Sequence, residues 1–432
     1  MHARPITRLP AVTDWRAFAA RPYRPFRLLA VAQGFIGALT GPAITVPLLL
    51  TVGAHPALAT ALAVLPAVGT MSQRWLPAML DRTDGNLRGL VILLATIGEP
   101  RGFLLAGVVA LAALGWLPAW ATIALIGVIS GVLGALGATA YSLQQSWYQI
   151  ILPDEERRLV APRLGGITLG IGAVILLPLA VTIDRLVEGI GLWAYVAPLA
   201  IAGIAGLAPL VVLRRLPSPG RIRVPRQTPW GSESKARLRK HGNVMTLALL
   251  SAGLSPFLSI YAISVLGTGA GFAIAISAIS SGTLVLASIY VSTQLRGGSS
   301  SLLLRRSFVV RGLALFLGLA AHPANPLAPL ILVVVAILLA AGDTAGQLAA
   351  SERLFRLATG PGVLAFQSHF VVRNVGAYAG GVAASSVVML LGGWPAFAIL
   401  FVGAGIGRLT AARATEVTTP AGEPKMVAAT VA

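Results

Sequence analysis

An aspartate lies within a long apolar stretch of the C-terminal half of the chain. Asp343 occupies the sequence "LLAAGDTAGQL", in which no other residue is charged. Placing a carboxylate away from water is costly, so such a group usually has a role. It can take up and release a proton, or it can pair with a basic side chain, for which Arg311 and Arg373 are the candidates. The sequence leaves both interpretations open.

Uncharged polar side chains in other apolar stretches form a second set of candidates. Tyr141, Gln144, Gln145 and Tyr148 follow an i, i+3, i+4, i+7 spacing, which places them on one face of a helix. Further candidates are Gln33, Thr40, Tyr261 and Gln347. Polar groups inside a membrane must face protein or water. They can therefore contact a bound molecule, or they can hold neighbouring helices together.

The residue types needed for metal or covalent chemistry are largely missing. The chain has no cysteine, its five histidines are scattered, and no phosphate-binding "GxxxxGK[ST]" pattern occurs. Membrane-embedded hydrolases need a nucleophile with a base, or paired acids, and neither is evident. We therefore predict no metal, no cofactor and no enzymatic activity.

The composition is that of a membrane protein. Hydrophobic residues make up 56% of the 432 residues, charged residues only 11%, and the mean hydropathy is +0.82. Soluble domains carry about 25% charged residues. Membrane spans built from such a sequence should be helices of about 20 residues, because backbone groups in lipid must bond within their own segment. The sequence thus predicts an all-α integral membrane protein.

Twelve apolar segments are long enough to be considered as spans. They are residues 26–52, 56–77, 101–119, 121–145, 163–183, 190–213, 244–266, 268–292, 307–322, 325–349, 362–391 and 393–409. Residues 89–98 are too short to cross alone, so they form either an interfacial helix or an extension of the third span.

The basic residues give the orientation. With both termini on one side, every Lys and Arg except Arg185 falls on that side, and the positive-inside rule makes it cytoplasmic. This distribution accounts for most of the formal net charge of +19, together with contact to anionic membrane lipid. We therefore predict a multi-pass protein of a bacterial inner membrane, and no binding of nucleic acid.

The two halves of the chain repeat each other. A Pro-, Ser- and Arg-rich stretch separates two six-helix bundles, at 26–213 and 244–409. Pro42 and Gly53 precede Pro256 and Gly267 by 214 residues, and Arg101 and Arg163 precede Arg311 and Arg373 by 210. The remaining parts are a basic arm at 1–25, a central loop at 214–243 and a tail at 410–432.

The connection between the second and third expected spans is "PAMLDRTDGNLRG", residues 77–89. Together with the twelve-helix, two-half organisation, it is similar to the major facilitator superfamily, whose signature there is Gly-x-x-x-Asp-Arg-x-Gly followed by basic residues. Asp81 and Arg82 match the Asp-Arg pair, whereas Pro77 replaces the glycine and Gly85 comes one residue late. A tight polar turn that fixes topology is the alternative interpretation of this stretch.

The resemblance implies two halves related by a pseudo-two-fold axis, with the substrate between spans 1, 4, 7 and 10. It also implies a cytoplasmic gate, for which the candidates are Asp81, Arg82, Arg311 and Arg373. The expected function is secondary transport of a small molecule, in the form of proton-coupled efflux of a neutral or amphipathic compound with Asp343 as the coupling candidate. The alternative is a lipid-handling or non-transporting assembly protein on the same fold.

Overall fold

The computed structural model describes residues 23–152, 154–218, 232–255, 257–297, 300–357 and 362–417, and the regular structure in these ranges is helical. The first group of helices, called here the N-terminal group, comprises α2 (Arg24–Thr40), α3 (Pro42–Thr51), α4 (Pro56–Gly69), α5 (Leu76–Arg82), α6 (Leu87–Gly98), α7 (Arg101–Ala113), α8 (Ala119–Val128), α9 (Gly134–Ile151), α10 (Asp154–Ile190) and α11 (Trp193–Val212). The C-terminal group comprises α12 (Ser232–Leu254), α13 (Leu258–Ser264), α14 (Ala270–Gly297), α15 (Ser300–Leu317), α16 (Ala328–Leu357), α17 (Gly362–Met389) and α18 (Gly393–Val417).

Nine helical segments in the described ranges are long and apolar enough to cross a membrane. One of them, Leu87–Ala113, joins α6 and α7, so residues 89–98 belong to the third span rather than to an interfacial helix. Three expected spans coincide with helices outside this set. These three helices are α4, which is apolar but has only 14 residues, α15, which carries three arginines, and α17. The chain is a multi-pass membrane protein.

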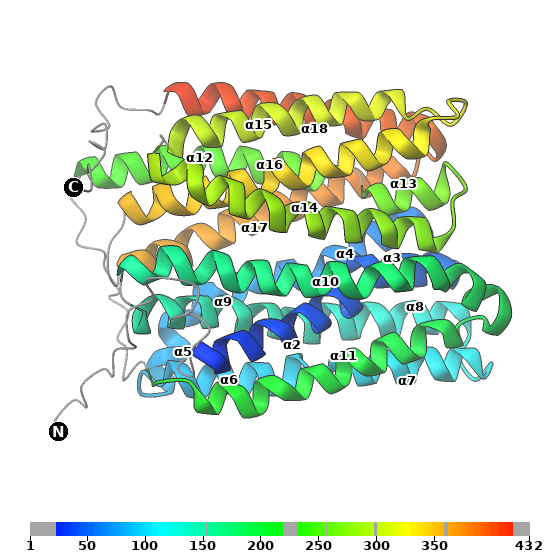
Figure 1. The fold of residues 1–432 in the computed structure, drawn as a ribbon, viewed down its shortest axis with the longest axis horizontal. Helices are drawn as coiled ribbons and strands as arrows, with labels where there is room; N and C mark the ends of the chain where they lie inside the picture. Colours follow the sequence, from blue (N-terminus) through cyan, green and yellow to red (C-terminus); the bar gives the residue numbers. More distant parts are fainter. Residues whose placement is uncertain are drawn as a thin grey trace.

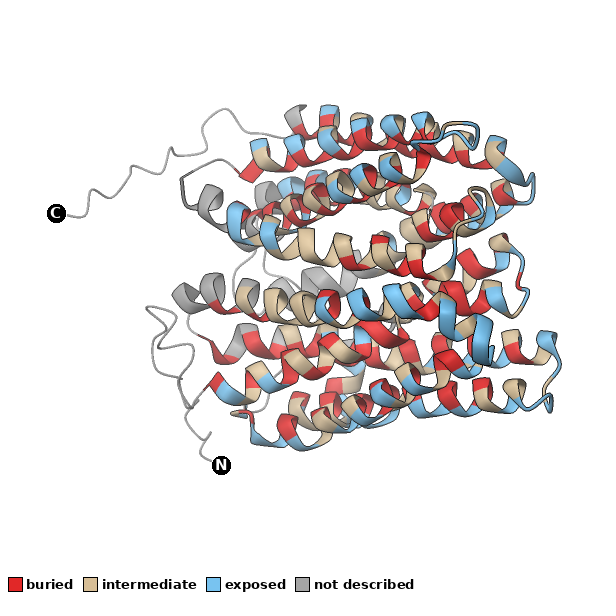
Figure 2. Ribbon diagram, turned by 45° about the vertical axis from the view of Figure 1, so that its right-hand side comes forward, coloured by how far each residue is buried: buried red, intermediate tan, exposed pale blue. Residues whose placement is uncertain are grey.

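The helices lie side by side, with the N-terminal group below and the C-terminal group above in the view of Figure 1. The two groups meet mainly where α10 packs along α14 and where α4 packs against α17. Exposed residues line the outward-facing sides of the bundle (Figure 2), and large apolar side chains such as Leu104, Val181 and Leu286 are among them. Apolar surface of this kind is stable against lipid tails.

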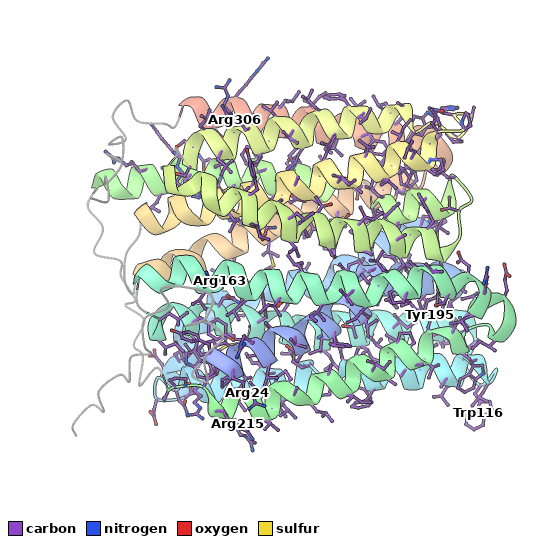
Figure 3. The ribbon with its side chains drawn as sticks, in the orientation of Figure 1. Arg24, Trp116, Arg163, Tyr195, Arg215 and Arg306 are labelled. Carbon is purple, nitrogen blue, oxygen red and sulfur yellow. The ribbon has the colours of Figure 1, made fainter. Side chains whose placement is uncertain are left out.

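The two ends of the bundle differ in their side chains. Arg24, Arg163, Arg215 and Arg306 lie toward the end where α2 begins and α18 ends (Figure 3), which we name the basic end. Trp116 lies at the opposite end (Figure 3), where it is 73% exposed. Arginine at one end and tryptophan at the other are typical of side chains at the two membrane surfaces.

Within each group, helices approach closely at glycines. A Cβ on Gly98 would lie 2.4 Å from Gly137 N, and one on Gly102 would lie 2.4 Å from Gly203 N. In the C-terminal group, a Cβ on Gly253 would lie 2.2 Å from the carbonyl oxygen of Tyr378. Small residues at such crossings increase van der Waals contact, which is the main force between helices in lipid. Each group is therefore held together by backbone-to-backbone packing.

Replacing Gly102 by Ala should lower the thermal unfolding midpoint of the purified protein. The new methyl group would contact the backbone of α11, and such overpacking costs about 1–3 kcal/mol. Gly107 lies on the same helix, and no described atom comes within 4 Å of a Cβ at that position. Gly107→Ala is thus the matched control, expected to leave the midpoint unchanged or slightly raised. Equal midpoints for the two variants would contradict this account of the packing.

Candidate functional site

The first span is broken near its middle. The helix α2 ends at Thr40, Gly41 is extended with ψ of −179°, and α3 begins at Pro42. Gly41 is required there because a Cβ would lie 2.2 Å from the carbonyl oxygen of Gly37. Pro42 lacks a backbone N–H and suits the first position of a new helix. The sequence "TGP" therefore produces the break.

The seventh expected span is broken in the same way. The helix α12 ends at Leu254, Phe257 is extended, and α13 begins at Leu258. Pro256, which repeats Pro42 at an offset of 214, lies between these helix ends but outside the described residues. Paired interruptions at corresponding positions of two repeats mark the binding site in several transporter folds, since irregular backbone at membrane depth must line a cavity or be buried in protein.

A cavity of about 290 Å³ lies beside these breaks. Its described lining residues are Gly37, Thr40, Gly41, Pro42, Thr45, Leu62, Ala63, Val64, Pro66, Ala67, Arg101, Ser130, Phe257 and Tyr378. Phe257 and Tyr378 come from the C-terminal group and the others from the N-terminal group, so the cavity lies between the groups. We name it the central cavity.

The polar groups of the central cavity come mostly from the N-terminal group. The Thr40 hydroxyl donates to the Ile36 carbonyl at 2.7 Å, and the Thr45 hydroxyl donates to the Gly41 carbonyl at 3.0 Å. Both threonines therefore offer an oxygen that can accept a hydrogen bond. Ser130 lies in a π-helical turn, Ile129–Leu133, and its buried hydroxyl has no hydrogen-bond partner in the described structure. Thr40, which the sequence predicts to contact a substrate, is among the described lining residues of the central cavity.

An acid and an arginine, Glu99 and Arg101, form an ion pair that the sequence analysis missed. Arg101 Nη1 lies 3.7 Å from Glu99 Oε2 and donates to the Gly98 carbonyl at 3.1 Å. The third span expected from the sequence starts at residue 101, which assigns Arg101 to a connection between spans. The span begins instead at Leu87, which puts Arg101 about 21 Å along it at 1.5 Å per residue. Counting the apolar run from residue 87 would have found both residues.

Asp343 of α16 forms an ion pair with Arg311 of α15. The side chain of Arg311 is 9% exposed and that of Asp343 is 40% exposed. Arg408 of α18 is also buried, and it interacts electrostatically with both of them and with Tyr378. Of the two partners expected for Asp343, Arg311 is therefore the one that the structure brings to it, whereas Arg373 lies exposed on α17.

Five of the predicted polar residues, Gln33, Tyr141, Gln144, Gln145 and Tyr148, lie together near the basic end of α2 and α9. Gln33 Nε2 donates to Gln144 Oε1 at 2.8 Å, and the amide of Gln144 hydrogen-bonds the Tyr148 hydroxyl. Gln33, Tyr141 and Tyr148 line a cavity of about 40 Å³. A cavity of this size holds a water molecule or two rather than a substrate. In this conformation these residues join two helices.

The remaining lining candidates lie elsewhere. Tyr261 is fully buried, donates a hydrogen bond to the Ala321 carbonyl, and packs against Trp394 and Phe397 with ring centroids 5.8 and 4.8 Å away. Gln347 is exposed on α16. Neither belongs to the described lining of the central cavity.

The stretch that matches the family signature forms a compact turn between α5 and α6. Asp84 and Gly85 both have positive φ, at 50° and 75°, as the tight-turn interpretation expects of Gly85. Asn86 caps α6, accepting a hydrogen bond from Gly89 N at 2.9 Å. Asp81 and Arg82, the gate candidates, are exposed at the end of α5.

At the opposite end, a carboxylate joins the two groups. Asp184 of α10 accepts a hydrogen bond at 2.9 Å from Gly271 N, in the first turn of α14. A Cβ on Gly271 would lie 2.3 Å from the Ala180 carbonyl oxygen, so the contact is tight. The two groups are thus in close contact at the end opposite the basic end.

Neutralising Asp343 alone should destabilise the protein, because it leaves Arg311 without its partner. Asp343 is partly exposed, so we expect a loss of about 1–3 kcal/mol for Asp343→Asn rather than the 3–5 kcal/mol of a fully buried pair. The double variant Arg311→Gln, Asp343→Asn should lose less than the sum of the single variants. Thermal unfolding of the four proteins gives the interaction energy, and additive losses would mean that the pair contributes nothing.

No family model and no curated protein matches the chain. Several solved structures match the chain. A POT family transporter in complex with 5-aminolevulinic acid matches with a TM-score of 0.69 at 12% identity, covering 92% of this chain and 95% of its own. The xylose transporter XylE from E. coli, in a partially occluded inward-open conformation, gives 0.67 at 14% identity, covering 92% and 96%.

A bacterial homologue of the iron transporter ferroportin matches in two states. Its inward-facing state gives a TM-score of 0.65 at 14% identity, covering 92% of this chain and 98% of its own. Its outward-facing state with soaked iron gives 0.57 at 16% identity, covering 91% and 99%. These structures are transporters of the major facilitator type. At such low identity the likeness concerns the fold, and this chain has the fold of major facilitator superfamily transporters.

Proposed function

We propose that the protein is a secondary transporter that moves a small molecule across the membrane by alternating access. The observation that carries this proposal is the pair of interrupted helices, in spans 1 and 7, beside a cavity between the two groups. The proposal includes twelve spans in two six-helix halves related by a pseudo-two-fold axis. Arg101 and Arg311, 210 residues apart, support it because both lie against a glycine of a neighbouring helix, Gly137 and Gly342.

The packing supports a rocking motion of the two groups. Glycine contacts within each group are too close to accept a methyl group, so each group should move as a rigid body. Between the groups, a Cβ on Gly170 or Gly376 would meet its nearest atom at 3.9 or 3.4 Å. These are ordinary van der Waals contacts with side-chain atoms, so at these two positions one group can rotate against the other without a close backbone contact being broken.

The described conformation is, in this proposal, inward-facing. The basic end takes the cytoplasmic side because of its arginines. The contact of Asp184 with α14 then closes the external side. The better match to the inward-facing than to the outward-facing ferroportin homologue supports the same assignment.

The direction of transport and the coupling ion are proposed from the sequence. The long apolar spans favour a neutral or amphipathic compound, and we propose proton-coupled efflux. Tyr378 lines the central cavity and interacts electrostatically with Asp343 and Arg408. The ion pair with Arg311 favours a structural charge network, which is the competing role for Asp343.

A cysteine at Thr40 tests alternating access directly, because the chain contains no other thiol. We expect Thr40→Cys to react with a membrane-impermeant thiol reagent in both right-side-out and inside-out vesicles, since the central cavity opens to each side in turn. Thr139→Cys is the matched control. Thr139 is also a buried threonine of the N-terminal group, but it lies outside the described lining of the cavity and should not react.

Reaction of Thr40→Cys from one face only would contradict alternating access and favour a non-transporting assembly protein. The same assay addresses coupling. If Asp343 carries the coupled proton, labelling depends on pH with Asp343 present and loses that dependence in Asp343→Asn. An unchanged pH profile in Asp343→Asn would leave Asp343 a structural role only.

Removing the carboxylate of Asp184 should shift the protein toward the outward-facing state. Loss of a helix-capping side chain costs about 0.5–2 kcal/mol, which corresponds to a population change of about 2- to 30-fold. Asp184→Ala should therefore speed the labelling of Thr40→Cys from the external face and slow it from the cytoplasmic face. Glu188→Ala, which removes an exposed carboxylate one turn along the same helix, is the control. Identical rates for both variants would mean that Asp184 does not hold the closed end.

A further inference from the structure

The central cavity contains a basic group whose donors are only partly used. Arg101 makes one hydrogen bond, to the Gly98 carbonyl, and one ion pair, to Glu99, within the described structure. A guanidinium has five N–H donors. The separation of 3.7 Å from Glu99 also exceeds the 2.7–2.9 Å of a charge-assisted hydrogen bond, so the pair is loose. Arg101 is the only charged residue among the described lining residues of the cavity.

Arg311, which repeats Arg101 at an offset of 210, is arranged differently. It is bonded to Asp343 and does not belong to the described lining of the central cavity. Each half thus pairs its arginine with an acid, but only the arginine of the first half lies among the described lining residues of the central cavity. The difference makes Arg101 the candidate for contact with a bound molecule.

Ser130 provides an independent indication. Its residue is 8% exposed and lines the same cavity, yet its hydroxyl has no hydrogen-bond partner in the described structure. A buried polar group without a partner costs free energy unless an occupant of the cavity supplies one. A hydroxyl and a guanidinium facing one cavity are suited to hydrogen-bond an oxyanion.

The rest of the lining is largely apolar. Leu62, Ala63, Val64, Pro66, Ala67 and Phe257 form much of the wall. One basic group next to an apolar wall matches a molecule with one anionic group and an apolar body. Glu99 lies close enough to repel a second anionic group, and Arg101 repels cations.

We infer that Arg101 and Ser130 form an anion-binding subsite, and that the transported molecule is an amphipathic monoanion such as an aryl-alkyl carboxylate. The inference rests on the proposed transport function and selects the amphipathic class over the neutral class. Glu99 acts in it as a competitor, since its carboxylate occupies Arg101 when the subsite is empty.

Binding of a matched pair of probes to the purified full-length chain tests the subsite. The probes are 4-phenylbutyrate and 4-phenylbutanamide, which share the apolar body and differ in charge, and calorimetry gives both affinities. We expect the carboxylate to bind at least about 10-fold more tightly than the amide, the usual gain of a charge-assisted hydrogen bond in a buried site. Equal affinities, or no carboxylate binding, would overturn the inference.

Variants separate a binding role from a structural one. Arg101→Gln should weaken carboxylate binding by about 10-fold or more and leave amide binding unchanged, and Ser130→Ala should weaken it by about 3-fold or more. Glu99→Gln should strengthen carboxylate binding, because the competitor for Arg101 loses its charge. If Glu99→Gln and Arg101→Gln weakened binding of both probes alike, the pair would be structural and the inference wrong.

Two controls keep the test clear. The double variant Glu99→Gln, Arg101→Gln removes both charges of the ion pair, so neither charge is left without its partner and the protein should remain folded. It should bind the carboxylate probe and the amide probe with similar affinity. Arg215→Gln, which removes an exposed arginine at the basic end, should bind both probes as the natural chain does. Failure of transport itself is seen separately, as one-sided labelling of Thr40→Cys with probe binding intact.

Discussion

Lipid offers no hydrogen bonds to a peptide backbone, and this constraint determines where the chain can depart from regular helix. At Gly41 and around Phe257 the helical ladder stops at membrane depth, and the freed polar groups need protein or water beside them. The central cavity lies at these two points. The position of the cavity, its polar lining and its location between two helix groups all follow from the places where two apolar spans are interrupted.

A second constraint shapes how the groups pack. Helices in lipid gain little from burying apolar side chains, so close backbone approach at glycines supplies the adhesion within each group. Between the groups the contacts differ in kind, since a Cβ on Gly170 or Gly376 would meet a side-chain atom of the other group at an ordinary van der Waals distance. Close backbone contact at glycines is therefore prominent within each group.

Much of the fold was predictable from the sequence, because span length, positive-inside charge and the repeat of Pro42 at Pro256 are set by local chemistry. Eight of the nine helices that are long and apolar enough to cross a membrane coincide with expected spans, whereas the third begins at Leu87 rather than at residue 101. Asp343 pairs with Arg311, one of its two expected partners. The number of spans, twelve, and the symmetry of the halves stay predictions. Polar spacing on α9 found residues that meet one another, Gln144 and Tyr148, but it could not say which cavity they face.

The site itself was harder to predict, for a physical reason. Arg101 was assigned to a connection because a charge usually ends an apolar run, and only the tertiary structure shows that Glu99 and a glycine-lined neighbouring helix accommodate it in the membrane. Ser130 carries no sequence signal, since small hydroxyl residues are common in such helices. Burial without a hydrogen-bond partner is a property of the folded chain.

The contact between Asp184 and the start of α14 has a consequence for the medium outside the cell. When the external side opens in the proposed cycle, the Asp184 carboxylate and the N-terminus of α14, which is the positive end of its helix dipole, separate from each other. Both are then exposed to water. Dissolved ions then screen each of them, and small anions compete for the helix end. The balance between the two conformations would thus respond to the ionic strength of one compartment only, so that the outer solution itself acts on the transport cycle.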